Sequence, residues 1–214
     1  MCTHDFSGSL EASPAQLQRL RTTVMVVALL NFTYFFVEGA VALRIGSASL
    51  MADSIDFLED TAVNTLIFLA LFWSLKARSW AGKAMAVIIC APALVAAWQI
   101  ASQFSNPQAP DPLRLVLTAG GAVVVNGICA WVLAKFHDDG GSLTKAAFLA
   151  ARNDVLVNVA IIGMGLLTAW TGSGWPDLIL AAIILVLNLS AAKEVWEVSE
   201  EERLTAKALE GDID

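Results

Sequence analysis

Six long apolar segments, separated by short polar breaks, dominate the pattern of residues along this chain. They cover residues 22–42, 50–75, 81–104, 113–136, 143–170 and 177–195. A helix needs about 20 mostly apolar residues to cross a bilayer, so each segment is long enough to span a membrane. Four of the five breaks between them contain Gly, Pro, Asn or Asp, which favour turns, and the break at residues 76–78 carries Lys and Arg. The pattern predicts an all-α membrane protein built as a six-transmembrane-helix bundle.

Composition supports the same fold class. The 214 residues are 57% hydrophobic and only 15% charged, and the mean hydropathy is +0.66, whereas soluble domains are about 45–50% apolar and about 25% charged. We expect a polar tail over residues 1–20, a transmembrane domain in a lipid bilayer over residues 21–196 and a short acidic tail over residues 197–214. The net charge of −7 comes largely from the tails and gives no reason to expect a nucleic-acid partner.

Lysine and arginine positions predict the orientation in the membrane, because these residues concentrate in cytoplasmic loops. If both termini are cytoplasmic, ten of the 13 lysines and arginines lie on the cytoplasmic side and two, Arg44 and Arg114, lie outside. Arg152 falls inside the fifth segment. The opposite orientation would invert this bias, so we expect a multi-pass protein of the cell (inner) membrane with both ends in the cytoplasm.

Carboxylates inside the second apolar segment are the most informative residues. A charged side chain at the middle of a bilayer costs at least about 2.5–3.5 kcal/mol, so such residues are functional candidates. Asp53, Asp56, Asp60 and Asn64 follow one another at spacings of three, four and four residues. Residues at those spacings share one helix face. The second segment therefore predicts a polar stripe within the membrane, with Glu59 beside it.

The fifth segment carries a matching pair, Asp154 and Asn158, which are four residues apart and hence on one face. Two interpretations are open. In the first, the polar residues only join helices, but such contacts contribute about 0.6 kcal/mol on average, too little to favour several carboxylates on one helix. In the second, Asp56, Asp60 and Asp154 converge and bind a divalent cation, which protons replace when it leaves. Other polar residues within apolar segments are Asn31, Glu38, Asn126 and Asn188.

Four motifs, in order along the chain, carry a resemblance to a known family. They are Asn31 and Glu38 followed by residues 46–53, then the Asp-x-x-x-Asp of residues 56–60, then residues 150–154, then residues 171–177. Together they resemble the cation diffusion facilitator family over the whole membrane part. The resemblance implies export of divalent metals from the cytoplasm in exchange for protons, a site enclosed by the first, second, fourth and fifth spans, and a homodimer.

Two departures from the family pattern affect the expected site. The chain looks like the shorter subgroup without the usual cytoplasmic C-terminal domain, so dimerisation would depend on the spans. Ala150 stands where the family has its first fifth-span ligand, which leaves three aspartates of an expected four ligands. Arg152 adds a positive charge that either reaches the cytoplasmic side or pairs with Glu59. The next candidate ligands, besides water, are Asn153, Asn158 and Asp53.

The identity of the metal depends on ligand type. No histidine lies in an apolar segment, because His4 and His137 both fall in polar ones. An all-oxygen site suits Mn²⁺ or Fe²⁺ better than a site with histidine does, whereas the family resemblance favours Zn²⁺, Co²⁺ or Cd²⁺. We rank Zn²⁺ and Co²⁺ first, with Mn²⁺, Fe²⁺ and Cd²⁺ as alternatives. Protons are the expected counter-ion, and no permanent cofactor is expected.

Two other functions stay open. Arg152 and the carboxylates would also serve as a proton relay in a transporter of organic cations. The loss of a ligand at Ala150 would fit a degenerate, non-transporting member that acts as a partner subunit. An enzyme is not expected, because the chain has no nucleophile–base pair, phosphate loop or cofactor fingerprint.

Overall fold

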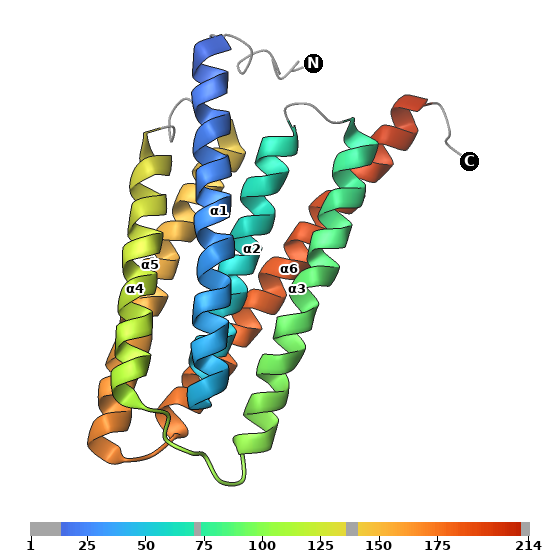
Figure 1. Ribbon diagram of the computed structural model, residues 1–214. Coiled ribbons are helices and arrows are strands. Elements are labelled where there is room, and N and C mark those ends of the chain that lie inside the picture. Colours follow the sequence, from blue (N-terminus) through green and yellow to red (C-terminus); the bar gives the residue numbers. More distant parts are fainter. Residues whose placement is uncertain (1–13, 71–73, 136–140, 211–214) are drawn as a thin grey trace, which may run out of the picture.

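Six α-helices make up the part of the chain that the computed structural model describes, which is residues 14–70, 74–135 and 141–210. Each predicted apolar segment lies mainly on one of these helices (Figure 1). The second predicted segment ends at residue 75, where α3 already begins, and the predicted break at residues 76–78 lies within α3. In chain order the helices are α1 (Pro14–Ile45), α2 (Ala48–Ala70), α3 (Leu75–Gln103), α4 (Pro112–Ala134), α5 (Gly141–Thr171) and α6 (Trp175–Glu210).

Three stretches of helix in the described residues are long and apolar enough to cross a membrane. They are Gln18–Ile45 of α1, Pro112–Ala134 of α4 and Ala147–Thr171 of α5, and a shorter apolar stretch, Trp175–Ser190, lies in α6. Helix α2 is not among them because its 23 residues include four carboxylates. The structure thus shows a helical protein of membrane type, and the same carboxylates that lower the hydropathy of α2 are the candidate functional groups.

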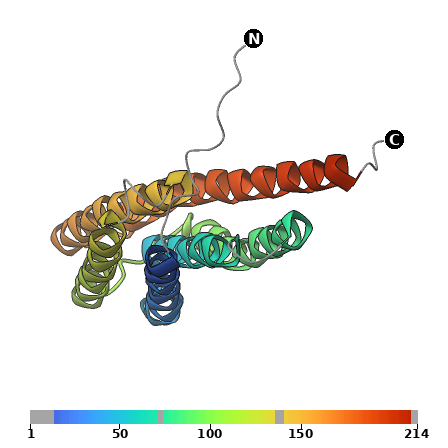
Figure 2. The ribbon, with the colours of Figure 1, turned by 90° about the horizontal axis from the view of Figure 1, so that it is seen from above.

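Four helices form a ring. Helix α1 packs against α2 and α4, and α5 packs against α4 and α2, so the four enclose a common interior. Helices α3 and α6 pair with each other outside this ring and pack against α2, as the view along the bundle shows (Figure 2). The described grouping of α1, α2, α4 and α5 matches the enclosure that the family resemblance implied.

The start of α1 and the end of α6 lie at the same end of the bundle, which we call the terminus end (Figure 1). The opposite end, the connection end, carries the short links α1–α2, α3–α4 and α5–α6. Two of these links begin with a glycine in the left-handed region, Gly46 (φ 70°) and Gly172 (φ 64°). Glycine adopts that conformation at no steric cost, so it ends α1 and α5 and allows the chain to reverse.

Asp177, at the start of α6, holds the α1–α2 link in place. Its carboxylate accepts hydrogen bonds from the hydroxyls of Ser47 (2.7 Å) and Ser49 (2.5 Å) and from the backbone N–H groups of Ala48 (2.7 Å) and Ser49 (3.4 Å). Asp177 is 2% exposed. The negative charge lies at the N-terminus of α2, where the helix dipole favours it. Two of the motif segments, residues 46–53 and 171–177, are therefore bonded to each other at the connection end.

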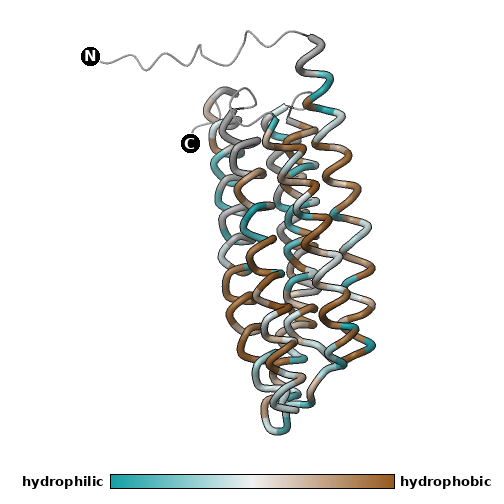
Figure 3. The backbone as a smooth tube through the Cα atoms, turned by 90° about the vertical axis from the view of Figure 1, so that its left-hand side faces the viewer, coloured by the Kyte–Doolittle hydropathy of each residue, from teal (hydrophilic) through white to brown (hydrophobic). Residues whose placement is uncertain are grey.

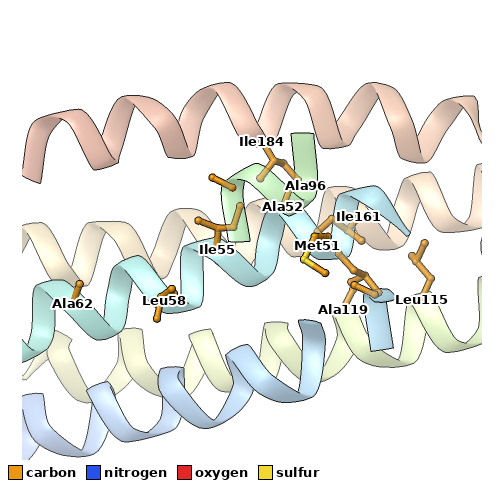
Figure 4. Close-up of a cluster of buried hydrophobic side chains, with 13 residues drawn as sticks. Met51, Ala52, Ile55, Leu58, Ala62, Ala96, Leu115, Ala119, Ile161 and Ile184 are labelled. Atoms are coloured by element: carbon orange, nitrogen blue, oxygen red, sulfur yellow. The ribbon is translucent and has the colours of Figure 1, made fainter. Parts of the chain in front are cut away.

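The apolar core lies between α2 and its neighbours and combines alanines with Leu, Ile and Met side chains. Figure 4 shows Ile55 and Ala52 of α2 near Ala96 and Ile184, with Met51, Leu115, Ala119 and Ile161 in the same cluster. Small side chains allow helices in a bilayer to approach closely, where packing rather than the hydrophobic effect holds them together. The core thus fixes the position of α2, the helix that carries most of the buried carboxylates.

Large apolar side chains lie on the outside of the bundle. Trp170 is 84% exposed, Leu94 is 71% exposed and Trp98 is 69% exposed, and Figure 3 shows apolar positions along the length of the helices. A soluble monomer rarely exposes apolar patches of such extent. The distribution, apolar outside and carboxylates inside, is the one expected for a chain whose surroundings are lipid.

Candidate metal site

The interior enclosed by α1, α2, α4 and α5 is acidic and contains many hydrogen-bond acceptors. Glu38, Asp53, Glu59 and Asp60 are each at most 8% exposed, and no lysine, arginine or histidine is buried in the described residues. Buried carboxylates are normally paired with a positive charge or hydrogen-bonded, because burying an isolated charge is costly. In the described interior the balancing charge must therefore come from protons or from a bound cation.

Asp60 is oriented by a residue of α1. The amide Nδ2 of Asn31 donates a hydrogen bond to Asp60 Oδ2 (3.1 Å), and Cys129 of α4 donates through Sγ to Asn31 Oδ1 (3.7 Å). Asn31 is 0% exposed. A fixed amide donor on one carboxylate oxygen leaves the other oxygen of Asp60 available for a ligand. This set, Asn31, Asp60 and Cys129, joins α1, α2 and α4, and we call it the terminus-side layer.

Asp53 forms a second set with residues of α1 and α5. The amide Nδ2 of Asn158 donates to Asp53 Oδ1 (3.3 Å) and to the backbone oxygen of Asp154 (3.0 Å). The Glu38 carboxyl lies within hydrogen-bonding reach of Asp53. We call Glu38, Asp53 and Asn158 the connection-side layer, because Asp53 lies one turn and a half from the start of α2.

The two layers follow from the antiparallel packing of α1 on α2. Asn31 and Glu38 are seven residues apart on α1, and Asp60 and Asp53 are seven residues apart on α2. Two turns of helix separate residues at that spacing, which places the layers about 10 Å apart along the axis. The sequence had identified all four polar residues, but which helix partner each one meets depends on the register between α1 and α2, and no local pattern encodes it.

Asp56 and Asp154 lie between the two layers. Both are half-buried, and their carboxyl groups lie within electrostatic range of each other, of Asp53 and of Asp60. No group of three or more His, Cys, Asp or Glu side chains in the described residues is close enough to hold one ion. The three predicted core ligands, Asp56, Asp60 and Asp154, therefore border a shared interior, and their convergence on one ion stays a prediction.

Two residues of the fifth-span motif lie away from this interior. Asn153 and Arg152 are both exposed, whereas Ala150 is half-buried and Ala151 is buried. Arg152 forms no ion pair with Glu59 in the described part of the chain. Of the candidate amides, Asn158 is the one that the structure brings to the carboxylates. The polar tracts with His4 and His137 lie outside the described residues.

Comparison with known proteins identifies relatives of one kind. No family profile matches the chain. The chain is 24% identical over 202 residues to the zinc transporter ZitB of Yersinia pestis, with 88% of this chain and 65% of that protein aligned. It is 22% identical over 191 residues to the cadmium, cobalt and zinc/H(+)-K(+) antiporter of Bacillus subtilis, with 82% of this chain and 61% of that protein aligned. The chain thus spans less than two-thirds of the length of these relatives.

Proposed function

We propose that this chain, a homologue of transporters of the cation diffusion facilitator family, moves a divalent transition-metal cation across the bilayer in exchange for protons. The observation that carries the proposal is the buried set of carboxylates Glu38, Asp53, Glu59 and Asp60 without a buried basic residue in the described chain. A doubly charged ion or protons would offset their repulsion, and the two compete for the same oxygens.

The proposed topology has all six helices crossing the membrane, with the terminus end in the cytoplasm. Two facts support it. The distribution of lysine and arginine favours cytoplasmic ends, and the start of α1 and the end of α6 lie at one end of the bundle (Figure 1). In this topology the metal enters from the terminus end and leaves at the connection end, where Asp177 bonds the α1–α2 link to α6. The membrane is the cell (inner) membrane, and the protein acts as a homodimer.

The proposed ligands of the transported ion are Asp56, Asp60 and Asp154, with water replacing the ligand that Ala150 does not supply. Carboxylates bind Zn²⁺ as well as harder divalent ions. The names of the relatives mention zinc, or cadmium, cobalt and zinc. We therefore keep Zn²⁺ and Co²⁺ as the first candidates, with Cd²⁺, Mn²⁺ and Fe²⁺ after them.

Uptake into proteoliposomes tests the proposal. The purified chain would be reconstituted alone and given a panel of Zn²⁺, Co²⁺, Cd²⁺, Mn²⁺ and Fe²⁺, with and without a pH gradient. We expect saturable uptake of at least one metal, accelerated when the lumen is acidic. Absence of uptake for every metal would contradict transport by this chain alone and would favour the non-transporting partner subunit. Transport of an organic cation without metal would favour the other alternative.

A further inference from the structure

The connection-side layer has more acceptors than donors. Both Glu38 oxygens, Asp53 Oδ2 and Asn158 Oδ1 are buried and receive no hydrogen bond from a donor group in the described residues, and all three side chains are 0% exposed. The Glu38 and Asp53 carboxyls lie within reach of each other, so a shared proton or a cation must join them. The one side-chain donor that the structure gives this layer is Asn158 Nδ2, and it already serves Asp53 Oδ1 and the Asp154 backbone. Buried polar atoms are almost always satisfied, so this set of oxygens indicates a missing partner.

The missing partner is not an ion bound at Asp60. Divalent metals bind oxygen ligands at about 2.0–2.6 Å, whereas Asp53 and Asp60 are separated by two turns, about 10 Å along α2. Side chains of a helix lean toward its N-terminus, so these two carboxylates tilt in the same direction and do not converge. One ion cannot bridge the two layers.

Three different helices supply the oxygens of the connection-side layer. Glu38 comes from α1, Asp53 from α2 and Asn158 from α5. The Asn158–Asp53 hydrogen bond holds the amide so that its Oδ1 is left without a donor. Two carboxylates and an amide oxygen are hard ligands of the kind that bind divalent cations. A bound cation neutralises buried carboxylate charges that an empty site leaves uncompensated.

We propose that Glu38, Asp53 and Asn158 form a second position for a divalent metal cation, two helical turns away from the position at Asp60, with Asp56 and Asp154 between the two. The inference rests on the proposed function, because it places the second ion on the same path. The position lies between the terminus-side layer and the connection end, so a transported ion would occupy it on its way to the outside. Two positions in series allow an entering ion to displace the one ahead of it by charge repulsion.

Metal titration of the purified full-length chain in lipid nanodiscs tests the proposal, with Co²⁺ and Zn²⁺ as the probes and calorimetry as the readout. We expect two ions per chain in the wild type. Asp53→Asn keeps an amide in contact with Asn158 but removes the charge, and we expect it to bind one ion. Asp60→Asn should also bind one ion. Ser54→Ala, next to Asp53 but bonded within its own helix, is the matched control and should bind two.

The outcomes separate this inference from the proposed function. One ion in the wild type and one in Asp53→Asn would overturn the second position and leave the proposed function intact. Loss of both ions in Asp53→Asn, in protein shown to be helical by circular dichroism, would also overturn it, because the two positions would then be one. No binding by the wild type would contradict both proposals. Glu38→Gln is the second variant if Asp53→Asn does not fold, and we expect it to weaken one of the two ions at least about tenfold.

Discussion

At the scale of single residues, Asn31 is the side chain that most directly controls a predicted ligand. It donates to Asp60 and accepts from Cys129, so it fixes the carboxylate from outside the α2 helix. Residues that orient a metal ligand typically contribute about 10–100-fold to affinity. Asn31 is a positioning residue in this sense and does not itself need to touch the ion.

We predict that Asn31→Ala weakens binding of Zn²⁺ or Co²⁺ at the terminus-side layer by about 10–100-fold, because Asp60 loses the donor that orients it. Asn31→Asp would add a charge without a donor and should weaken binding at neutral pH as well. Calorimetric titration in nanodiscs measures both. Gln99→Ala removes a buried amide of α3, outside the ring, and should leave the affinity unchanged. Equal affinities for Asn31→Ala and the wild type would contradict the positioning role.

The sequence identified the polar residues inside the apolar segments, but it did not predict which side chains they contact. The spacing of Asp53, Asp56 and Asp60 predicts one polar face, because helix periodicity is local, and Asp53 and Asp60 are buried while Asp56 is half-buried. Glu38 was noted without a role, and the structure places it beside Asp53. Asn153 was a candidate ligand, and the structure leaves it exposed. Which side of α5 faces α2 is a property of packing that five motif residues do not encode.

At the scale of elements, the link between Asp177 and the start of α2 is the main fixed point of the connection end. We predict that Asp177→Ala lowers the free energy of unfolding by on the order of 1–3 kcal/mol, because it leaves buried hydroxyl and N–H donors of Ser47, Ala48 and Ser49 unpaired. Reversible denaturation in bicelles measures the change.

The matched control for that prediction is Asp111→Ala. Asp111 also caps a helix, accepting from Leu113 N (3.0 Å) and Arg114 N (3.2 Å), but it is exposed to solvent. Loss of an exposed cap typically costs about 1 kcal/mol, and water replaces the lost acceptor. A smaller effect for Asp177→Ala than for Asp111→Ala would contradict the view that the buried contact stabilises the link.

Helix α6 extends well past the last predicted apolar segment, to Glu210, so most of the expected acidic tail is a helix extension. Residues 197–210 are helical, because their Glu, Arg, Ala, Leu and Lys residues favour helix. Lys83 of α3 donates to Glu200, and Arg203 donates to the same carboxylate through Nε (2.8 Å). A tail rich in charge reads as solvated from the sequence alone, whereas a contact with α3 gives it a fixed position.

This contact predicts a pH dependence. The hydrogen bonds from Arg203 and Lys83 lower the pKa of Glu200 to about 2, from an ordinary value of 4.5. A lowered pKa stabilises the folded form above the ordinary value, and that contribution is lost as the pH falls from about 4.5 toward 2. Amide exchange of residues 197–210 should be faster in Glu200→Gln than in the wild type at pH 7, and the difference should shrink below pH 4.5. Equal amide exchange in Glu200→Gln and the wild type at pH 7 would contradict a stabilising role for the Glu200 contacts.

At the scale of the whole molecule, the hydropathy pattern predicted a helical protein of membrane type because the apolar segments are long. The predicted break at residues 76–78 was wrong, because α3 already begins at Leu75. The grouping of α1, α2, α4 and α5 was implied by the family resemblance and not by any periodicity, whereas the pairing of α3 with α6 outside that ring was not predicted. Three described helices reach the hydropathy of a membrane span, and α2 does not, because it carries the carboxylates. Function and topology thus make opposite demands on one helix.

The two-layer interior also determines how the molecule as a whole should behave. In the described residues its carboxylates outnumber the donors that reach them, so an empty interior should hold protons and a loaded one should hold metal. Movement of metal in one direction should therefore be matched by protons moving in the other. This coupling of metal and proton movement depends most on the buried carboxylate Asp60.

Metal-driven proton flux through reconstituted liposomes measures this coupling most directly. A pH-sensitive dye trapped in an acidic lumen would report protons leaving as external Zn²⁺ or Co²⁺ is added to the wild-type chain, to Asp60→Asn and to the control Gln99→Ala. We predict rapid, metal-dependent alkalinisation for the wild type and the control, and a flux at least about tenfold slower for Asp60→Asn. An unchanged flux in Asp60→Asn would contradict the assignment of the buried carboxylates as the shared site for metal and protons.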